Sequence, residues 1–209
     1  MKLTPDDDRT SAFATADVSV VLNNTAAAEG LPQIVIGPYI QERFVAGENR
    51  TLLSMYSPLR FGSATVDGRP VAVARGQERN RNVYSLLHMI PAKSQKTTTL
   101  KLDGAVDLHD SWYTLVVRAQ PTLKPDQLHV SVEVPEGWTI DEAPGMQTDF
   151  ARRVSATLTQ QKAEKFRAHL VPDSGSRNLW ERLVHRGLNR AARRCSNSGS
   201  RSGTSHSDQ

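Results

Sequence analysis

The chain has 209 residues, of which 38% are hydrophobic, 23% charged and 6% aromatic, with a formal charge of +4. This length suits one all-β domain or two small ones, and the apolar share is enough for a buried core. No apolar run approaches the roughly 20 residues of a membrane-spanning helix, and the N-terminus lacks the apolar core of a signal peptide. The single cysteine, Cys195, excludes an internal disulfide and a cysteine-based zinc site.

The positive charge is concentrated near the C-terminus. Residues 177–209 contain seven arginines and two acids, a net charge of +5, which leaves about −1 for residues 1–176. Nucleic-acid-binding domains present a strongly basic surface, and the body of this chain does not. We therefore expect no nucleic acid partner.

The N-terminal half is predicted to consist of short strands. Residues 1–14, which include three consecutive aspartates, are predicted to form a disordered lead-in. Apolar alternation or short apolar runs then predict strands over 18–22, 34–36, 51–56, 61–66, 70–73, 83–90 and 97–102. Asp67-Gly68 predicts a tight hairpin between two of these strands. We also interpret 83–90 and 97–102 as a hairpin with a longer loop.

Residues 112–138 carry the clearest pattern. Leu128, Val130, Val132 and Val134 alternate with polar residues, which is typical of a half-buried strand. The segment ends in a Pro-Glu-Gly-Trp corner at Trp138. Beyond it, residues 154–159 and 166–171 also alternate and are interpreted as strands. A helix over 150–170, where Ala, Gln, Lys and Glu are frequent, is the competing interpretation.

The spacing of turn signals, mostly 8–14 residues, predicts an Ig-like antiparallel β-sandwich over residues 15–172. If the body consists of two packed β modules, the seam is expected near 103–111 or near 143–148. Residues 176–195 then change to helical periodicity and predict a short amphipathic helix. The Ser/Gly-rich residues 196–209 are predicted to be disordered.

The predicted C-terminal helix is strongly basic. Its expected contacts with an anionic surface are Arg182, Arg186, Arg190, Arg193 and Arg194. Two interpretations stay open: the helix binds an anionic membrane or a partner, or its apolar stripe packs on the sandwich while the arginines remain in solvent.

The sequence shows no established catalytic or cofactor motif. Asp107, His109, Asp110 and the adjacent Ser111 form the densest polar cluster, and a hydrolase using them is the least favoured hypothesis. Residues so close in sequence more often form a turn, since a catalytic triad is normally assembled from distant segments. Histidines are scattered without metal-ligand spacing, and no phosphate-binding glycine loop is present. We expect no catalytic residues, no cofactor and no metal.

Three aromatic residues suggest an alternative function. Trp112, Tyr113 and Trp138 are candidates for an aromatic sugar-binding platform of a carbohydrate-binding module. The competing interpretation is that they anchor the core of the sandwich. The platform interpretation requires an exposed, coplanar pair.

A series of short motifs in a fixed order adds a resemblance to a known family. The motifs are Asn24-Thr25, Gly30-Leu31-Pro32, Tyr56-Ser57-Pro58-Leu59, Asp67-Gly68, Arg81-Asn82-Val83-Tyr84, Ile90-Pro91-Ala92, Leu102-Asp103-Gly104, Gln120-Pro121 and Val134-Pro135-Glu136-Gly137-Trp138. Over roughly residues 15–145 the chain resembles the C-terminal part of the bacterial domain of unknown function 4012 family. Its members are actinobacterial envelope proteins with an N-terminal membrane anchor and a large exported portion, and no activity is established for them.

The resemblance implies an extracytoplasmic β-domain that is the C-terminal part of a longer, membrane-anchored protein. We therefore expect a non-enzymatic exported domain with a structural or recognition role in the bacterial cell envelope. The alternative is a carbohydrate-binding module for envelope polysaccharide. The expected partners are accordingly such a polysaccharide, or a membrane or protein surface contacted by the basic helix.

Overall fold

The computed structural model describes residues 1–37, 45–120, 122 and 124–173, and in these residues it contains fourteen β-strands and one short helix. The largest sheet has eight strands, which from edge to edge are β12 (Gln147–Phe150), β13 (Arg153–Gln160), β10 (Asp126–Glu133), β1 (Lys2–Pro5), β2 (Ser11–Asn24), β8 (Ser94–Asp107), β4 (Arg60–Val66) and β5 (Arg69–Pro70). Two smaller sheets contain β11 (Trp138–Glu142), β14 (Glu164–Pro172) and β9 (Trp112–Val117), and β3 (Asn49–Ser57), β7 (Arg81–Ile90) and β6 (Ala74–Glu78). The prediction of an all-β sandwich is confirmed.

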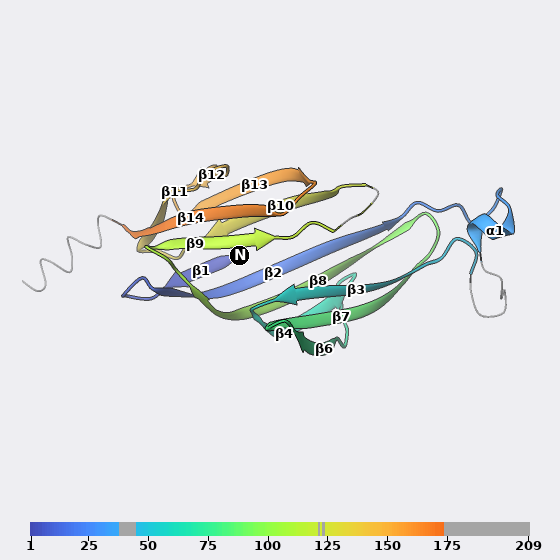
Figure 1. Ribbon diagram of the computed structural model, residues 1–209, viewed down its shortest axis with the longest axis horizontal. Coiled ribbons are helices and arrows are strands. Elements are labelled where there is room, and N and C mark those ends of the chain that lie inside the picture. The colour runs from blue at the N-terminus through green and yellow to red at the C-terminus, as the bar shows by residue number, and fades with distance from the viewer. Residues whose placement is uncertain (38–44, 121, 123, 174–209) are drawn as a thin grey trace, which may run out of the picture.

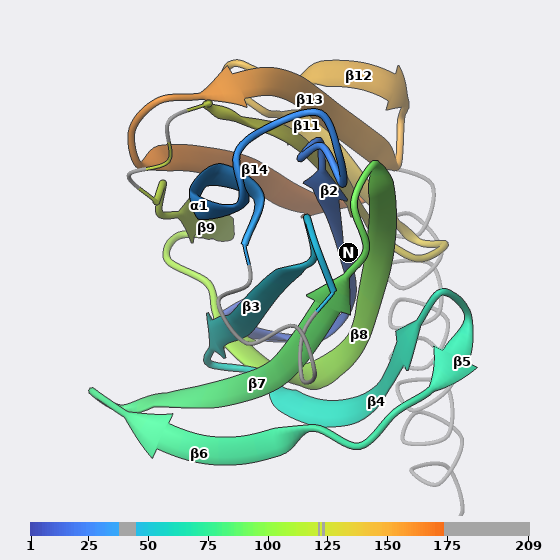
Figure 2. The ribbon, with the colours of Figure 1, turned by 90° about the vertical axis from the view of Figure 1, so that its right-hand side faces the viewer.

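The large sheet curves around the two smaller sheets (Figure 2). All three sheets contribute to one buried hydrophobic cluster, for example through Leu100, Leu170 and Tyr84. Neighbouring strands pair antiparallel in this part of the chain, except that β1 and β10 are parallel. The core is therefore a single body of side chains shared by the facing sheets.

The longest elements are β2 and β8, which have 14 residues each and pair along their whole length. Alanines 12, 14 and 16 of β2 are buried beside Leu100 and Leu102 of β8. Fourteen residues in extended conformation span about 46 Å. The pair therefore forms the long axis of the molecule (Figure 1), and the short helix α1 (Gln33–Ile36) lies beyond one of its ends.

Several predicted elements are confirmed. In β10 the side chains of Val130 and Val132 are buried, as is Val134 just after it, while the intervening residues are more exposed. Asp67 and Gly68 both have positive φ, 48° and 77°, and join the paired strands β4 and β5. Residues 153–160 and 164–172 are strands and not a helix.

The prediction of a disordered lead-in over residues 1–14 is wrong. Residues Lys2–Pro5 form β1, and β2 begins at Ser11. The side chain of Leu3 is fully buried, so this strand is part of the core. The aspartate-rich turn between the two strands, residues 6–10, is exposed throughout, because charged side chains favour an exposed turn over a sheet interior.

The predicted hairpin of 83–90 and 97–102 is also wrong. β7 pairs with β3 and β6, whereas β8 pairs with β2 and β4, so the two strands lie in different sheets. Similarly, the predicted strand at 34–36 is the helix α1. The two proposed seams fall at the end of β8 with the following turn, and at the turn between β11 and β12.

Candidate functional site

The basic segment lies outside the described residues. This applies to the predicted helix 176–195 and to the five arginines proposed as anionic-surface contacts, Arg182, Arg186, Arg190, Arg193 and Arg194. Both interpretations of that segment therefore stay predictions.

The polar cluster around His109 forms a tight turn between β8 and β9. The N–H of His109 donates to the carbonyl of Trp112 at 3.1 Å, and the N–H of Trp112 donates to the carbonyl of His109 at 2.9 Å. Asp110 and Ser111 between them have φ of 52° and 65°, which is the backbone of a two-residue hairpin turn. In the described chain no hydrogen bond joins the side chains of Asp107, His109 and Asp110, so the turn accounts for the cluster.

The three predicted aromatic residues do not form a platform. Tyr113 is buried in the core, and burial raises the pKa of its phenol to about 12. Trp112 is the neighbouring residue of the strand, so it points to the opposite, outer face. There its ring stacks on His169 with 4.9 Å between ring centroids, and the guanidinium of Arg167 lies 4.2 Å from the ring centroid. Trp138 is half-buried against the core.

The side chains around Trp112 make their polar and ring contacts with one another. Nδ1 of His169 is 2.8 Å from a carboxylate oxygen of Asp141, which fixes the imidazole beside the indole. With Arg167 and His169 both against the ring, the indole face is occupied. Within the described ranges no group of three His, Cys, Asp or Glu residues is arranged to hold a metal ion.

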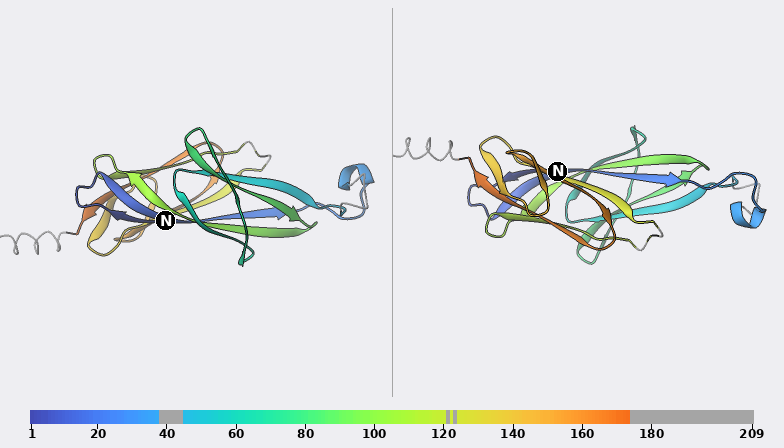
Figure 3. Two further views of the ribbon diagram at one scale, coloured as in Figure 1. Left: turned by 90° about the horizontal axis from the view of Figure 1, so that it is seen from below. Right: turned by 90° about the horizontal axis from the view of Figure 1, so that it is seen from above.

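Four exposed apolar residues lie together at one end of the molecule. We call Leu31, Ile34, Val35 and Val45 the apolar tip. These side chains are 49%, 74%, 65% and 67% exposed, and none of the residues of α1 is buried. Figures 1 and 3 show α1 beyond the ends of β2 and β8, at the opposite end of the long axis from the end of β14. Residues 25–37 contain one charged residue, Glu29.

The tip has a defined backbone. The carbonyl of Pro32 accepts from the N–H of Val35 at 2.8 Å, and the carbonyl of Gln33 accepts from the N–H of Gly37 at 2.7 Å. Gly37, with φ of 55°, ends the helix in a conformation that favours glycine. The N–H of Gly47 then donates to the carbonyl of Ile36 at 2.9 Å, which joins α1 to the returning chain.

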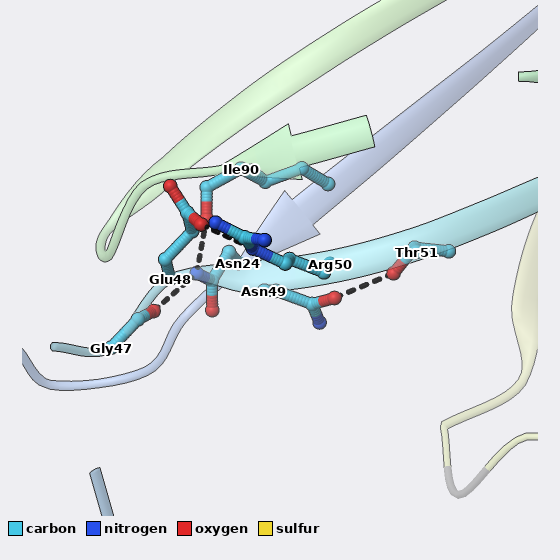
Figure 4. Close-up of polar contacts among 7 residues, drawn as sticks. All are labelled: Asn24, Gly47, Glu48, Asn49, Arg50, Thr51 and Ile90. Atoms are coloured by element: carbon cyan, nitrogen blue, oxygen red, sulfur yellow. Dashed lines mark hydrogen bonds and ion pairs between the residues drawn. The ribbon is translucent and has the colours of Figure 1, made fainter. Parts of the chain in front are cut away.

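Asn24 closes the base of the tip (Figure 4). Its side-chain nitrogen lies 2.7 Å from the carbonyl oxygen of Gly47 and 2.9 Å from that of Ile90, with the carbonyl of Pro91 at 3.0 Å. Its side-chain oxygen accepts from the N–H of Ala26 at 3.0 Å. Since Asn24 is buried, one side chain ties together the end of β2, the residues just before β3 and the end of β7. We call this arrangement the Asn24 clamp.

Gly47 fits the clamp because it has no side chain. Its φ is +73°, and a Cβ there would lie 2.6 Å from the carbonyl oxygen of Ala27 and 2.8 Å from Cβ of Ala92. Beside it, Glu48 and Arg50 form an ion pair with 2.8 Å between Oε1 and Nε. The apolar tip is thus attached to the sheets by a closely packed, hydrogen-bonded segment around Asn24 and Gly47, which we call the neck.

The sequence alone did not identify the tip. Its aliphatic run, Ile34–Ile36, predicts a strand because short apolar runs are usually buried. The available signal was the bracketing of Ile34–Ile36 by Pro32 and Gly37, which favours one turn of helix over a strand.

No helix among the described residues is long and apolar enough to cross a bilayer. In comparisons with known proteins, neither a family model nor a curated protein matches this chain.

Proposed function

We propose that this chain is a non-enzymatic recognition domain of the bacterial cell envelope, and that it contacts a lipid bilayer through the apolar tip. The proposal rests on one observation: Leu31, Ile34, Val35 and Val45 are exposed beyond one end of the long strand pair β2 and β8. The resemblance to an envelope family supports the same setting.

The tip suits a bilayer better than a folded partner. The tip projects from the sheets, which matches insertion into a fluid layer. The sequence of the tip from 30 to 41 contains no charged residue, with Glu42 and Arg43 following, and this matters because charged side chains are costly inside a membrane.

The expected affinity is low. Complete burial of an aliphatic side chain gains about 1.5–3 kcal/mol, so half to three-quarters exposed side chains would gain on the order of 1 kcal/mol each. Four of them gain about 4 kcal/mol together, a factor of about 10³, which makes the contact weaker than that of a single myristoyl chain at about 10⁴ M⁻¹. Such a contact is reversible and suits a domain that is also held by other parts of its protein.

The test is co-sedimentation of the full chain with vesicles of uncharged phosphatidylcholine. The double variant Ile34→Asp, Val35→Asp should lower partitioning about tenfold or more, since each 1.4 kcal/mol is a factor of ten. Phe150→Asp is a matched control, because Phe150 is 73% exposed but lies in β12, toward the other end of the molecule. It should partition like the parent chain.

Two further arms separate alternative surfaces. Leu52 and Leu87 are exposed and directly paired on the outer face of β3 and β7. The variant Leu87→Asp therefore tests whether this face, and not the apolar tip, binds the vesicles. Deletion of 177–195 asks whether the basic segment binds, in which case partitioning would require anionic lipid and fall with added salt. Absence of binding by the parent chain, or a tip variant that binds like the parent, would refute the proposal.

A further inference from the structure

A concave groove lies where β4 of the large sheet approaches β6 and β7. These three strands are at the lower side of Figure 2. It is open rather than enclosed, with a volume of about 560 Å³. Its lining residues are Arg60, Phe61, Arg75, Gly76, Gln77, Asn82 and Tyr84. Ligand sites in proteins commonly have volumes of about 300–1,000 Å³.

The strand register explains why polar side chains meet here. Arg75 pairs with Tyr84 and Gln77 pairs with Asn82, so these four residues share the inner face of β6 and β7. On the facing sheet, Phe61 lies 5.5 Å from Tyr84 between ring centroids, and the guanidinium carbon of Arg75 is 5.1 Å from the Phe61 centroid. Arg75 therefore reaches across the opening between the two sheets.

The groove walls are held by hydrogen bonds to the connection before β4. The hydroxyl of Tyr84 donates to the carbonyl of Leu59 at 2.7 Å, and the amide nitrogen of Asn82 donates to the same carbonyl at 3.0 Å. The side-chain oxygen of Asn82 accepts from Gln77 at 3.4 Å. The polar groups of the groove are thus positioned before any ligand arrives, which lowers the entropy lost on binding.

The lining is positively charged. It contains two arginines and no acid. Arg60 is 3.3 Å from Asp103 through one nitrogen, and its side chain is 75% exposed, while a guanidinium has five N–H donors. Arg75 has no carboxylate within 4 Å among the residues that the structure describes. A concave wall with charge of one sign concentrates ions of the other sign.

We propose that this groove binds a segment of an anionic polysaccharide, with Arg60 and Arg75 contacting its acidic groups. Guanidinium groups match the geometry of both carboxylate and phosphate oxygens. The side-chain amide of Gln77, of which one N–H is used by Asn82, supplies the polar contacts that sugar hydroxyls need. Because the groove is open, a chain passes through it without its ends being enclosed. The site does not involve the apolar tip, so its test is independent of bilayer binding.

The test uses the full chain and isothermal titration with three oligomers. An oligogalacturonate carries carboxylates, a glycerol phosphate oligomer carries phosphates, and a maltose oligomer of similar length is uncharged. We expect the uncharged oligomer to bind much more weakly than at least one anionic oligomer, and the anionic arms identify the preferred acidic group. Failure of both anionic oligomers to bind would overturn the proposal.

Matched variants separate the groove from general charge attraction. Arg60→Gln with Arg75→Gln should weaken binding of the anionic oligomer about tenfold for each arginine. Arg69→Gln with Arg81→Gln removes the same charge from exposed positions outside the groove and should leave the affinity unchanged. Equal weakening by both pairs would overturn the proposal. Arg60→Gln alone guards against misfolding, since the Arg60 side chain is 75% exposed and surface ion pairs such as the one with Asp103 contribute little to stability. This single variant should still weaken binding about tenfold.

Discussion

The side-chain amide of Asn24 donates a hydrogen bond to the backbone carbonyl of Gly47, with 2.7 Å between the two atoms. These residues stand on either side of the apolar tip in the sequence, at the end of β2 and just before β3. The contact closes the neck without using any residue of the tip. The fold can therefore be stable while the tip presents its apolar side chains to a bilayer.

Asn24→Ala is expected to destabilise the fold. The change removes the donor that satisfies the carbonyls of Gly47 and Ile90 and the acceptor of Ala26. Leaving a buried polar group unsatisfied costs about 1–3 kcal/mol, and we expect a loss in this range in the free energy of unfolding by urea. The neighbouring variant Asn23→Ala, at an exposed position, should change it by less than about 0.5 kcal/mol. Equal effects of the two variants would contradict the clamp.

Gly47→Ala tests the close packing of the neck. Gly30 is a suitable comparison because it also has positive φ, +80°, but an added Cβ there meets nothing within 4 Å. Both substitutions carry backbone strain of about 1–3 kcal/mol, and only Gly47→Ala adds a clash. We expect its loss of unfolding free energy to exceed that of Gly30→Ala by about 1 kcal/mol or more. Similar losses would show that the neck relaxes around a methyl group.

His88 is expected to make stability depend on pH. It is buried on β7, with Nε2 3.1 Å from the hydroxyl of Thr98, and burial, aided by nearby Lys96, lowers its pKa below the usual 6.5. Below about pH 6.5 the unfolded chain binds a proton that the folded chain resists, so stability should be lost as pH falls. The double variant His88→Leu, Thr98→Val removes both polar partners. Its free energy of unfolding should therefore depend less on pH between about pH 7 and pH 5. An unchanged slope would exclude His88 as its source.

Tyr113 should be the last described tyrosine to ionise. Burial raises its pKa to about 12, so between about pH 10 and pH 12 the unfolded chain releases a proton that the folded chain keeps. Its contribution to stability is complete below about pH 10 and is lost as the pH rises through that range. When the variant Tyr113→Phe is titrated and followed by tyrosinate absorbance, the step at the highest pH should be missing. Loss of a step near pH 10 instead would place this phenol in solvent.

The strands were predictable because alternation is a local property. The pattern from Leu128 to Val134 shows which side chains are buried, and β10 follows it. The alternation of apolar and polar residues does not show which strands are hydrogen-bonded neighbours in a sheet. β7 and β8 bury side chains toward each other from facing sheets, which gives the same pattern as a hairpin of one sheet.

The candidate sites were not predictable for a related reason. Ile34 and Val35 carry no signal that distinguishes an exposed apolar residue from a core residue, since sequence patterns assume that apolar residues are buried. The groove joins Arg60 and Arg75 from different sheets, and their proximity depends on register and sheet packing. The aromatic platform failed because Trp112 and Tyr113 are adjacent in one strand and must face opposite sides.

The most direct test of the account is the depth of residue 34 in a bilayer. The single native cysteine allows a Cys195→Ser, Ile34→Cys chain to be labelled at the tip with an environment-sensitive fluorophore. On addition of phosphatidylcholine vesicles we predict a blue-shifted emission and quenching by lipids brominated in their acyl chains. The same label at position 150 should show neither change. A label at position 34 whose emission stays that of water at saturating lipid would contradict the proposal.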